Sequence, residues 1–167
     1  MPAVRRAARE PGPPAYGPAA PAAAGTPGHH AFVVDASVSA AWLLPDEADD
    51  YTTAALVATV TAEVWVPQLW TLEMANLLLS AQRRRRITAD KRAELAAAAA
   101  ALRLAVCREP VSLPALDALA AAQGLSAYDA CYLELALRRR LPLATRDAAL
   151  LAAMQRTRVP LAVAARA

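Results

Sequence analysis

Short, strongly apolar runs of three to five residues recur along the 167-residue chain, and segments with helical periodicity separate them. Runs this short and this apolar are typical of strands that are buried on both faces. Strands that alternate with helices pair in parallel, with helices packed on both faces of the sheet. The chain is therefore predicted to adopt an α/β fold, a three-layer α/β/α sandwich with a central parallel sheet of four to five strands. The predicted strands are residues 31–34, 64–66, 141–144 and 159–163.

Local signals predict where several of the intervening helices begin and end. Thr88 is a favoured N-cap residue, Pro45 cannot continue a helix, and Gly124 suits the left-handed position that follows one. The predicted helices are residues 38–44, 51–61, 67–86, 88–105, 114–123, 126–140 and 147–156.

Proline and glycine are concentrated at the N-terminus. Residues 1–30 contain seven of the thirteen prolines and four of the five glycines, which interrupt any helical or strand period. We expect residues 1–30 to be a disordered Pro/Ala/Gly-rich extension and residues 31–167 to form one domain. The extension also carries +2 of the total net charge of +3. The domain is therefore close to neutral and lacks the basic footprint of a strong nonspecific nucleic-acid binder.

Composition argues against a membrane or secreted protein. The chain has no run of about eighteen strongly apolar residues, and prolines and glycines interrupt the N-terminus where a signal peptide needs an apolar core. Cys107 and Cys131 form no CxxC motif and have no histidine neighbours, so we expect reduced thiols and no zinc site. A cytoplasmic location is predicted.

Four acidic residues lie where predicted strands end or helices begin, the region of a parallel sheet at which ligands gather. Asp35 directly follows the first predicted strand, and Asp147 follows the third after a short turn. Glu73 and Asp129 lie near the starts of two helices. Two carboxylates about 4 Å apart repel by roughly 4 kcal/mol at an effective dielectric near 20, so a cluster needs protons or a cation. Oxygen ligands without histidine or cysteine favour Mg²⁺ or Mn²⁺.

Such an ion lowers the pKa of bound water and neutralises a phosphodiester transition state, which predicts phosphodiester hydrolysis by activated water. Ser37 and Thr145 flank the predicted site and are placed to hydrogen-bond a carboxylate, a water or a phosphate. The arginine runs at residues 83–86 and 138–140 end predicted helices, where they complement the helix dipole. Contacts from these arginines to RNA phosphates are the alternative interpretation.

The acids also have structural interpretations. Asp129 forms a capping-box-like Ser-x-x-Asp with Ser126, and Asp147 suits an N-cap. Asp35 is harder to explain in this way, because an acid directly after a buried strand is costly unless something satisfies it. The four acids together favour a site over four separate structural roles.

Four segments of the chain resemble, in order and with fitting spacing, the successive motifs of PIN-domain proteins. The likeness covers about residues 31–163 and is closest to the VapC-type toxin ribonucleases of VapBC toxin–antitoxin pairs. The segments are residues 33–38 (VVDASV), 67–76 (PQLWTLEMAN), 125–130 (LSAYDA) and 143–147 (LATRD).

This resemblance implies a PIN fold and an Mg²⁺- or Mn²⁺-dependent endoribonuclease that is the toxin of a type II toxin–antitoxin system. It also implies an RNA substrate, a homodimer, and a cognate VapB-like antitoxin that inserts a segment near the acidic pocket. By motif position, the residues implied as catalytic metal ligands are Asp35, Glu73, Asp129 and Asp147. Ser37 and Thr145 are implied as their polar support.

Two features depart from the family pattern. Residues 1–30 lie outside it, and the residues that follow Asp147 offer no further acid for a second metal ion. The main alternative is a PIN-like module that binds RNA or a protein without cleavage, although the presence of all four acids argues against it. A phosphohydrolase that forms an aspartyl-phosphate would carry a second acid two residues after Asp35, where this chain has Ser37.

Overall fold

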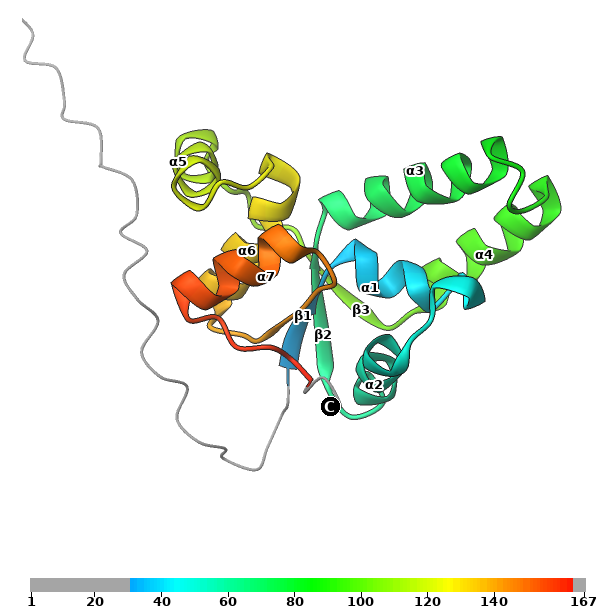
Figure 1. Cartoon of the computed structure of the whole chain (residues 1–167), viewed down its shortest axis with the longest axis horizontal. Helices are drawn as coiled ribbons and strands as arrows, with labels where there is room; N and C mark the ends of the chain where they lie inside the picture. The colour runs from blue at the N-terminus through cyan, green and yellow to red at the C-terminus, as the bar shows by residue number, and fades with distance from the viewer. Residues whose placement is uncertain (1–30, 164–167) are drawn as a thin grey trace, which may run out of the picture.

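The computed structural model describes residues 31–163, and its centre is a sheet of four parallel strands (Figure 1). The strands are β1 Ala31–Val34, β2 Glu63–Pro67, β3 Leu104–Cys107 and β4 Leu143–Ala144. Their order across the sheet is β3-β2-β1-β4, so β1 lies in the interior and pairs with both β2 and β4. The extension predicted over residues 1–30 lies outside the described residues, as do residues 164–167 of the predicted domain.

Helices cover both faces of the sheet. They are α1 Ala36–Ala41, the 3-10 helix η1 Pro45–Glu47, α2 Asp50–Ala58, α3 Leu69–Arg83, α4 Ala89–Ala101, α5 Leu113–Gln123, α6 Ala127–Arg139 and α7 Ala148–Thr157. Helices α1 to α4 connect β1 to β2 and β2 to β3, and α5 and α6 connect β3 back to β4. Figure 1 shows these two sets on opposite sides of the sheet, with α7 beside α6. The predicted fold class, a three-layer sandwich around a parallel sheet, is confirmed.

Capping residues position the helices that carry predicted site residues. Ser126 Oγ accepts a hydrogen bond from Asp129 N at 3.1 Å, and this bond begins α6. Asp147 Oδ1 accepts one from Leu150 N at 2.7 Å, and this bond begins α7. Gly124 ends α5 in the left-handed conformation, with φ of 63°. Each of these three ends was predicted from local sequence.

One strand was not predicted, and one predicted strand was wrong. The helix predicted to reach residue 105 ends at Ala101, and the strand β3, which was not predicted, follows it. The alanine-rich sequence has no glycine or proline to mark the change, and pairing with β2 decides the conformation. The predicted last strand contributes only an isolated bridge between Leu161 and Leu143. Its Pro160 has no N–H with which to extend the ladder.

The hydrophobic core lies around β1 and β4 and the helices that pack on them. Val33, Leu133, Leu143 and Leu150 are all fully buried and belong to one hydrophobic cluster. This packing fixes the carboxyl ends of β1 and β4 side by side. The residues that follow those two strands are therefore held next to each other.

The structure bears on two further expectations. Cys107 and Cys131 are both free thiols, the first buried and the second partly exposed. Within residues 31–163, none of the helices has the length and apolar character that crossing a membrane requires.

Truncation of Leu143 tests the packing of β4. We expect Leu143→Ala to lower the free energy of unfolding by about 2–5 kcal/mol, because it leaves a cavity in a fully buried position. The matched control is Leu113→Ala on α5, where the side chain is 78% exposed and the change should stay within about 0.5 kcal/mol. Urea denaturation of both variants measures the difference. Equal losses would contradict this description of the core.

Candidate active site

Asp35 is a buried acid at the carboxyl end of the sheet. It directly follows β1, and only 5% of its surface is exposed. Its Oδ2 atom accepts hydrogen bonds from Ser37 Oγ at 2.6 Å and from Thr145 Oγ1 at 2.8 Å. The structure thus brings both predicted polar residues onto the Asp35 carboxylate.

Backbone pairing between β1 and β4 explains why these side chains meet. Asp35 N donates to Ala144 O at 2.9 Å, which places the next residue, Thr145, beside the Asp35 side chain. Ser37 Oγ also accepts a hydrogen bond from Arg146 N at 3.1 Å. The turn between β4 and α7 is therefore bound to the end of β1 through two hydroxyl groups.

Glu73 lies on the second turn of α3 and is partly buried. The hydroxyl of Tyr132, on α6, donates a hydrogen bond to Glu73 Oε2. Tyr132 is fully buried, and burial together with the bond to Glu73 raises the pKa of its hydroxyl, which keeps it protonated as a donor. Sequence reasoning missed Tyr132. The available signal was its position three residues after Asp129, on the same face of the helix.

Asp129 and Asp147 begin helices, as their structural interpretations predicted. Asp129 is partly exposed in the first turn of α6, and its Oδ2 accepts a hydrogen bond from Ser126 Oγ at 2.6 Å. Asp147 caps α7, and its backbone N–H donates to Thr145 Oγ1 at 3.0 Å. Asp147 is thus linked to Asp35 through one shared threonine hydroxyl.

Burial and neighbouring charges raise the pKa of two of the site carboxylates, Asp35 and Glu73. Burial is the largest cause of the raised pKa of Asp35; its two hydroxyl hydrogen bonds oppose the rise, and the charge of Asp129 adds to it. Burial also raises the pKa of Glu73, the tyrosine hydrogen bond opposes this rise, and the charges of Asp35 and Asp129 add to it. Asp147 is not among the charges that raise either pKa.

The donor set suits a hard divalent cation. The site side chains offer carboxylate and hydroxyl oxygens, the ligand type that Mg²⁺ and Mn²⁺ prefer. A dication would offset the burial of these carboxylates and the smaller repulsion between charges, which together raise the pKa of Asp35 and of Glu73. Within residues 31–163, however, no three His, Cys, Asp or Glu side chains are grouped so as to hold an ion. The structure therefore shows a convergence of acids rather than a complete set of ligands already in place.

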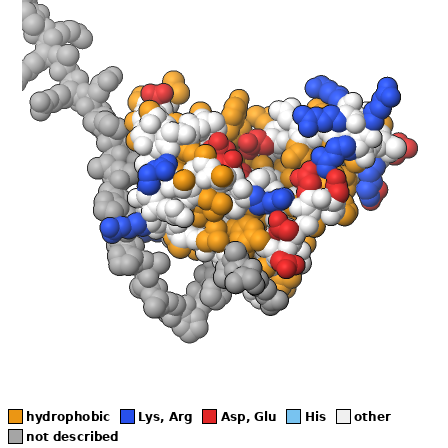
Figure 2. All heavy atoms as spheres, viewed as in Figure 1, with side chains coloured by type: hydrophobic (Ala, Val, Ile, Leu, Met, Phe, Trp, Pro, Cys, Tyr) orange, Lys and Arg blue, Asp and Glu red, His pale blue; other side chains and the backbone are white. Residues whose placement is uncertain are grey.

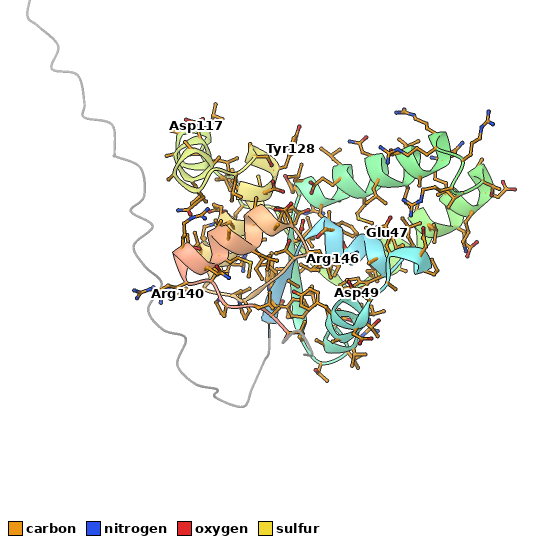
Figure 3. All side chains as sticks on the ribbon, viewed as in Figure 1. Glu47, Asp49, Asp117, Tyr128, Arg140 and Arg146 are labelled. Carbon is orange, nitrogen blue, oxygen red and sulfur yellow. The ribbon has the colours of Figure 1, made fainter. Side chains whose placement is uncertain are left out.

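A cavity of about 470 Å³ adjoins these acids. Its lining includes Ser37 from α1, Glu73 and Asn76 from α3, and Tyr128 from α6. Asn76 lies one turn after Glu73, as the helical spacing indicated. Figure 2 shows acidic side chains gathered near the middle of this face, with hydrophobic side chains around them. Figure 3 shows Tyr128 at the start of α6, close to the beginning of α3.

The arginines at two helix ends form intramolecular ion pairs. Arg86 contacts Asp46 at 2.7 Å and Glu47 at 2.8 Å. Arg138 and Arg139 both pair with Glu109. These contacts favour the structural interpretation of Arg86, Arg138 and Arg139 over contacts with RNA phosphates.

Comparison with known proteins agrees with this architecture. The family model described as the PIN domain matches residues 32–155. No curated protein matches the chain. Among solved structures, the chain is similar to PAE2754 from Pyrobaculum aerophilum, with a TM-score of 0.59 and 24% sequence identity over 74% of this chain and 84% of that one. At this identity the likeness concerns the fold alone.

Neutralisation of Asp35 should stabilise the protein in the absence of divalent metal. The folded-state pKa of Asp35 is raised, so the stability that its protonated form contributes is complete below the unfolded pKa and is lost as the pH rises through the folded pKa. We therefore expect Asp35→Asn to raise the free energy of unfolding at pH 7, and the gain to shrink towards pH 4.

Urea denaturation in EDTA at the two pH values measures this gain. The matched control is Asp117→Asn on α5, an exposed acid outside the site, which should change stability little. A loss of stability at pH 7 in Asp35→Asn would mean that the bonds from Ser37 and Thr145 outweigh the burial of the charge.

Proposed function

Because the chain belongs to the PIN domain family, whose fold is of nuclease type, we propose that it is an Mg²⁺- or Mn²⁺-dependent endoribonuclease. The observation that carries the proposal is a meeting of acids at the carboxyl end of the sheet: Ser37, which hydrogen-bonds Asp35, lines the same cavity as Glu73 and Tyr128, the neighbour of Asp129. These acids come from β1, α3 and α6, so folding brings mutually repelling charges together. Buried acids whose pKa is raised, such as Asp35 and Glu73, are typical of functional sites when they lie beside a cavity.

Three of the four acids predicted as ligands are proposed to hold the dication directly. Asp35, Glu73 and Asp129 would hold the dication, and Asp147 would stand beside them through its link to Thr145. When bound, Mg²⁺ or Mn²⁺ supplies a Lewis acid that activates water and neutralises charge on the phosphodiester. In the hydrolysis, the water oxygen bonds to phosphorus as one P–O ester bond breaks, and the leaving oxygen gains a proton. No protein nucleophile takes part.

Hydroxyl groups hold two of these carboxylates in position. Ser37 and Thr145 both donate to the same oxygen of Asp35, which restricts rotation of its carboxylate. Tyr132 plays the corresponding part for Glu73 from within the core. Because all three donors are themselves held by the fold, the carboxylates are oriented before any ligand arrives.

The biological role we propose is that of the toxin in a type II toxin–antitoxin system. It is supported by the order of the four motifs, which resembles that of VapC-type toxins. The proposal includes a homodimer in the cytoplasm and a cognate VapB-like antitoxin that covers the acidic site. A small adjacent gene whose product relieves growth inhibition by this chain would support it, and growth unaffected by expression of the chain would argue against it.

Loss of one site carboxylate should abolish RNA cleavage. We expect Asp35→Asn and Glu73→Gln each to lower the rate of Mn²⁺-dependent cleavage by about a hundredfold or more, a loss of roughly 2.7 kcal/mol of transition-state stabilisation. The readout is a gel assay with total RNA and then with defined oligonucleotides. Asp117→Asn removes an exposed acid on α5 that belongs to none of the motifs, and this variant should cleave at the wild-type rate. Full activity in folded Asp35→Asn would refute the proposal.

Divalent metal should stabilise the wild-type protein through the same residues. At about 100 times its Kd, an ion that binds only the folded state adds roughly 2.7 kcal/mol to the free energy of unfolding. We expect Mn²⁺ to raise the melting temperature of the wild type and to leave that of Asp35→Asn nearly unchanged. A wild-type melting temperature that millimolar Mn²⁺ does not move would favour the alternative of a non-cleaving binding module.

A further inference from the structure

The backbone N–H of Thr145 lies just beyond the hydrogen bonds of the sheet. Thr145 follows β4 and is only 2% exposed, so its N–H needs an acceptor within the protein. Ala144 O accepts from Asp35 N at 2.9 Å, so the N–H groups on either side of Ala144 face away from β1. On that side Leu143 N donates to Pro160 O at 3.0 Å, but the pairing is a single isolated bridge that stops at Leu143. Within residues 31–163, the sheet therefore offers the Thr145 N–H no acceptor.

The hydroxyl of Tyr51, on α2, accepts this hydrogen bond. Thr145 N donates to Tyr51 Oη at 3.2 Å, between residues 94 positions apart in the sequence. Burial raises the pKa of Tyr51, so its hydroxyl is an uncharged acceptor. An acceptor without charge adds no repulsion beside the buried carboxylate of Asp35, whereas an acid in this position would. Tyr51 lies outside all four sequence motifs that define the site.

A capping box fixes Tyr51 at the second position of α2. Asp49 N donates to Thr52 Oγ1 at 2.9 Å, and Thr52 N donates to Asp49 Oδ1 at 2.7 Å. Thr52 is fully buried, and its carbonyl accepts from Trp42 Nε1 at 2.8 Å. The hydroxyl of Tyr51 is therefore presented by an anchored helix start, which is more precise than a free loop.

Arg146 joins the same two segments from the other side. Its Nη1 donates to Glu47 O at 3.0 Å, and its Nε lies 3.5 Å from Asp49 Oδ2. Figure 3 shows these three labelled residues close together beside the start of α2. Arg146 N also donates to Ser37 Oγ at 3.1 Å. The turn between β4 and α7 is thus bound to the start of α2 as well as to Ser37. Because the ion pair is partly exposed, it adds less than the buried bond to Tyr51.

From these contacts, and on the basis of the proposed function, we infer that Tyr51 is a positioning residue of the active site. Its hydroxyl fixes the backbone of Thr145, and Thr145 Oγ1 in turn donates to Asp35 Oδ2 and accepts from Asp147 N. A shift of Thr145 would release both acids from a contact that orients them. Groups that orient a metal ligand without touching the ion typically cost about 10–100-fold in metal affinity or activity when they are removed.

Amide hydrogen exchange in EDTA tests this inference without metal and without catalysis. Tyr51→Phe keeps the ring and removes only the acceptor. We expect the Thr145 and Asp147 N–H groups to exchange about tenfold faster in this variant, the effect of one lost hydrogen bond, relative to the core Val33 N–H, which reports global unfolding. The matched control is Thr59→Val, which removes a hydroxyl hydrogen bond at the other end of α2 and should leave both rates unchanged. Unchanged exchange at Asp147 in Tyr51→Phe would overturn the inference.

The dependence of RNA cleavage on Mn²⁺ gives a second readout. We expect Tyr51→Phe to need about tenfold more Mn²⁺ for half-maximal cleavage and to keep the wild-type KM for RNA, because the hydroxyl acts on metal ligands and not on the substrate. Thr59→Val should show the wild-type dependence on Mn²⁺. An unchanged dependence in Tyr51→Phe would overturn the inference and leave the proposed function standing. Faster exchange at Thr145 and Asp147 without any cleavage by the wild type would refute the nuclease and support the control of these residues by Tyr51.

Discussion

At the carboxyl end of β1, the carboxylate of Asp35 is buried beside two hydroxyl groups and the start of α1. Burial of a charge is costly, and the bonds from Ser37 and Thr145 offset that cost only in part, because the pKa of Asp35 is still raised. The same two hydroxyls accept hydrogen bonds from the turn that leads into α7. One buried carboxylate thus connects the central strand, the first helix and the last helix.

The acids around Asp35 each have a local hydrogen-bond partner. Glu73 accepts a hydrogen bond from Tyr132, and Asp129 accepts one from Ser126, so the metal-free protein keeps its acids hydrogen-bonded. The charge of Asp129 nevertheless raises the pKa of both Asp35 and Glu73. A dication would remove this repulsion while the hydroxyl partners keep two of the carboxylates oriented. These two properties together distinguish the cluster from a set of ordinary surface acids.

Local pattern predicted the parts of this structure that depend on neighbours in sequence. The alternation of short apolar runs with helices gave the fold class, and Asp35 stood out because an acid after a buried strand is costly. For Asp147, helix capping and a place beside the site are compatible, because it caps α7 and its N–H donates to the threonine hydroxyl that bonds Asp35. Tyr132 and β3 were missed because each is defined by a partner distant in sequence: Glu73 in one case and β2 in the other.

Charge distribution decides how this domain can hold RNA. Residues 31–167 carry a net charge of about +1, since the extension holds +2 of the total of +3. Several arginines that could contact phosphates are engaged in ion pairs, and the run at the end of α3 begins ten residues after Glu73, about 15 Å along the helix. Little electrostatic affinity for the phosphate backbone therefore remains near the acids. Under the proposed function, the affinity of this site for a phosphate would therefore come mainly from the bound cation.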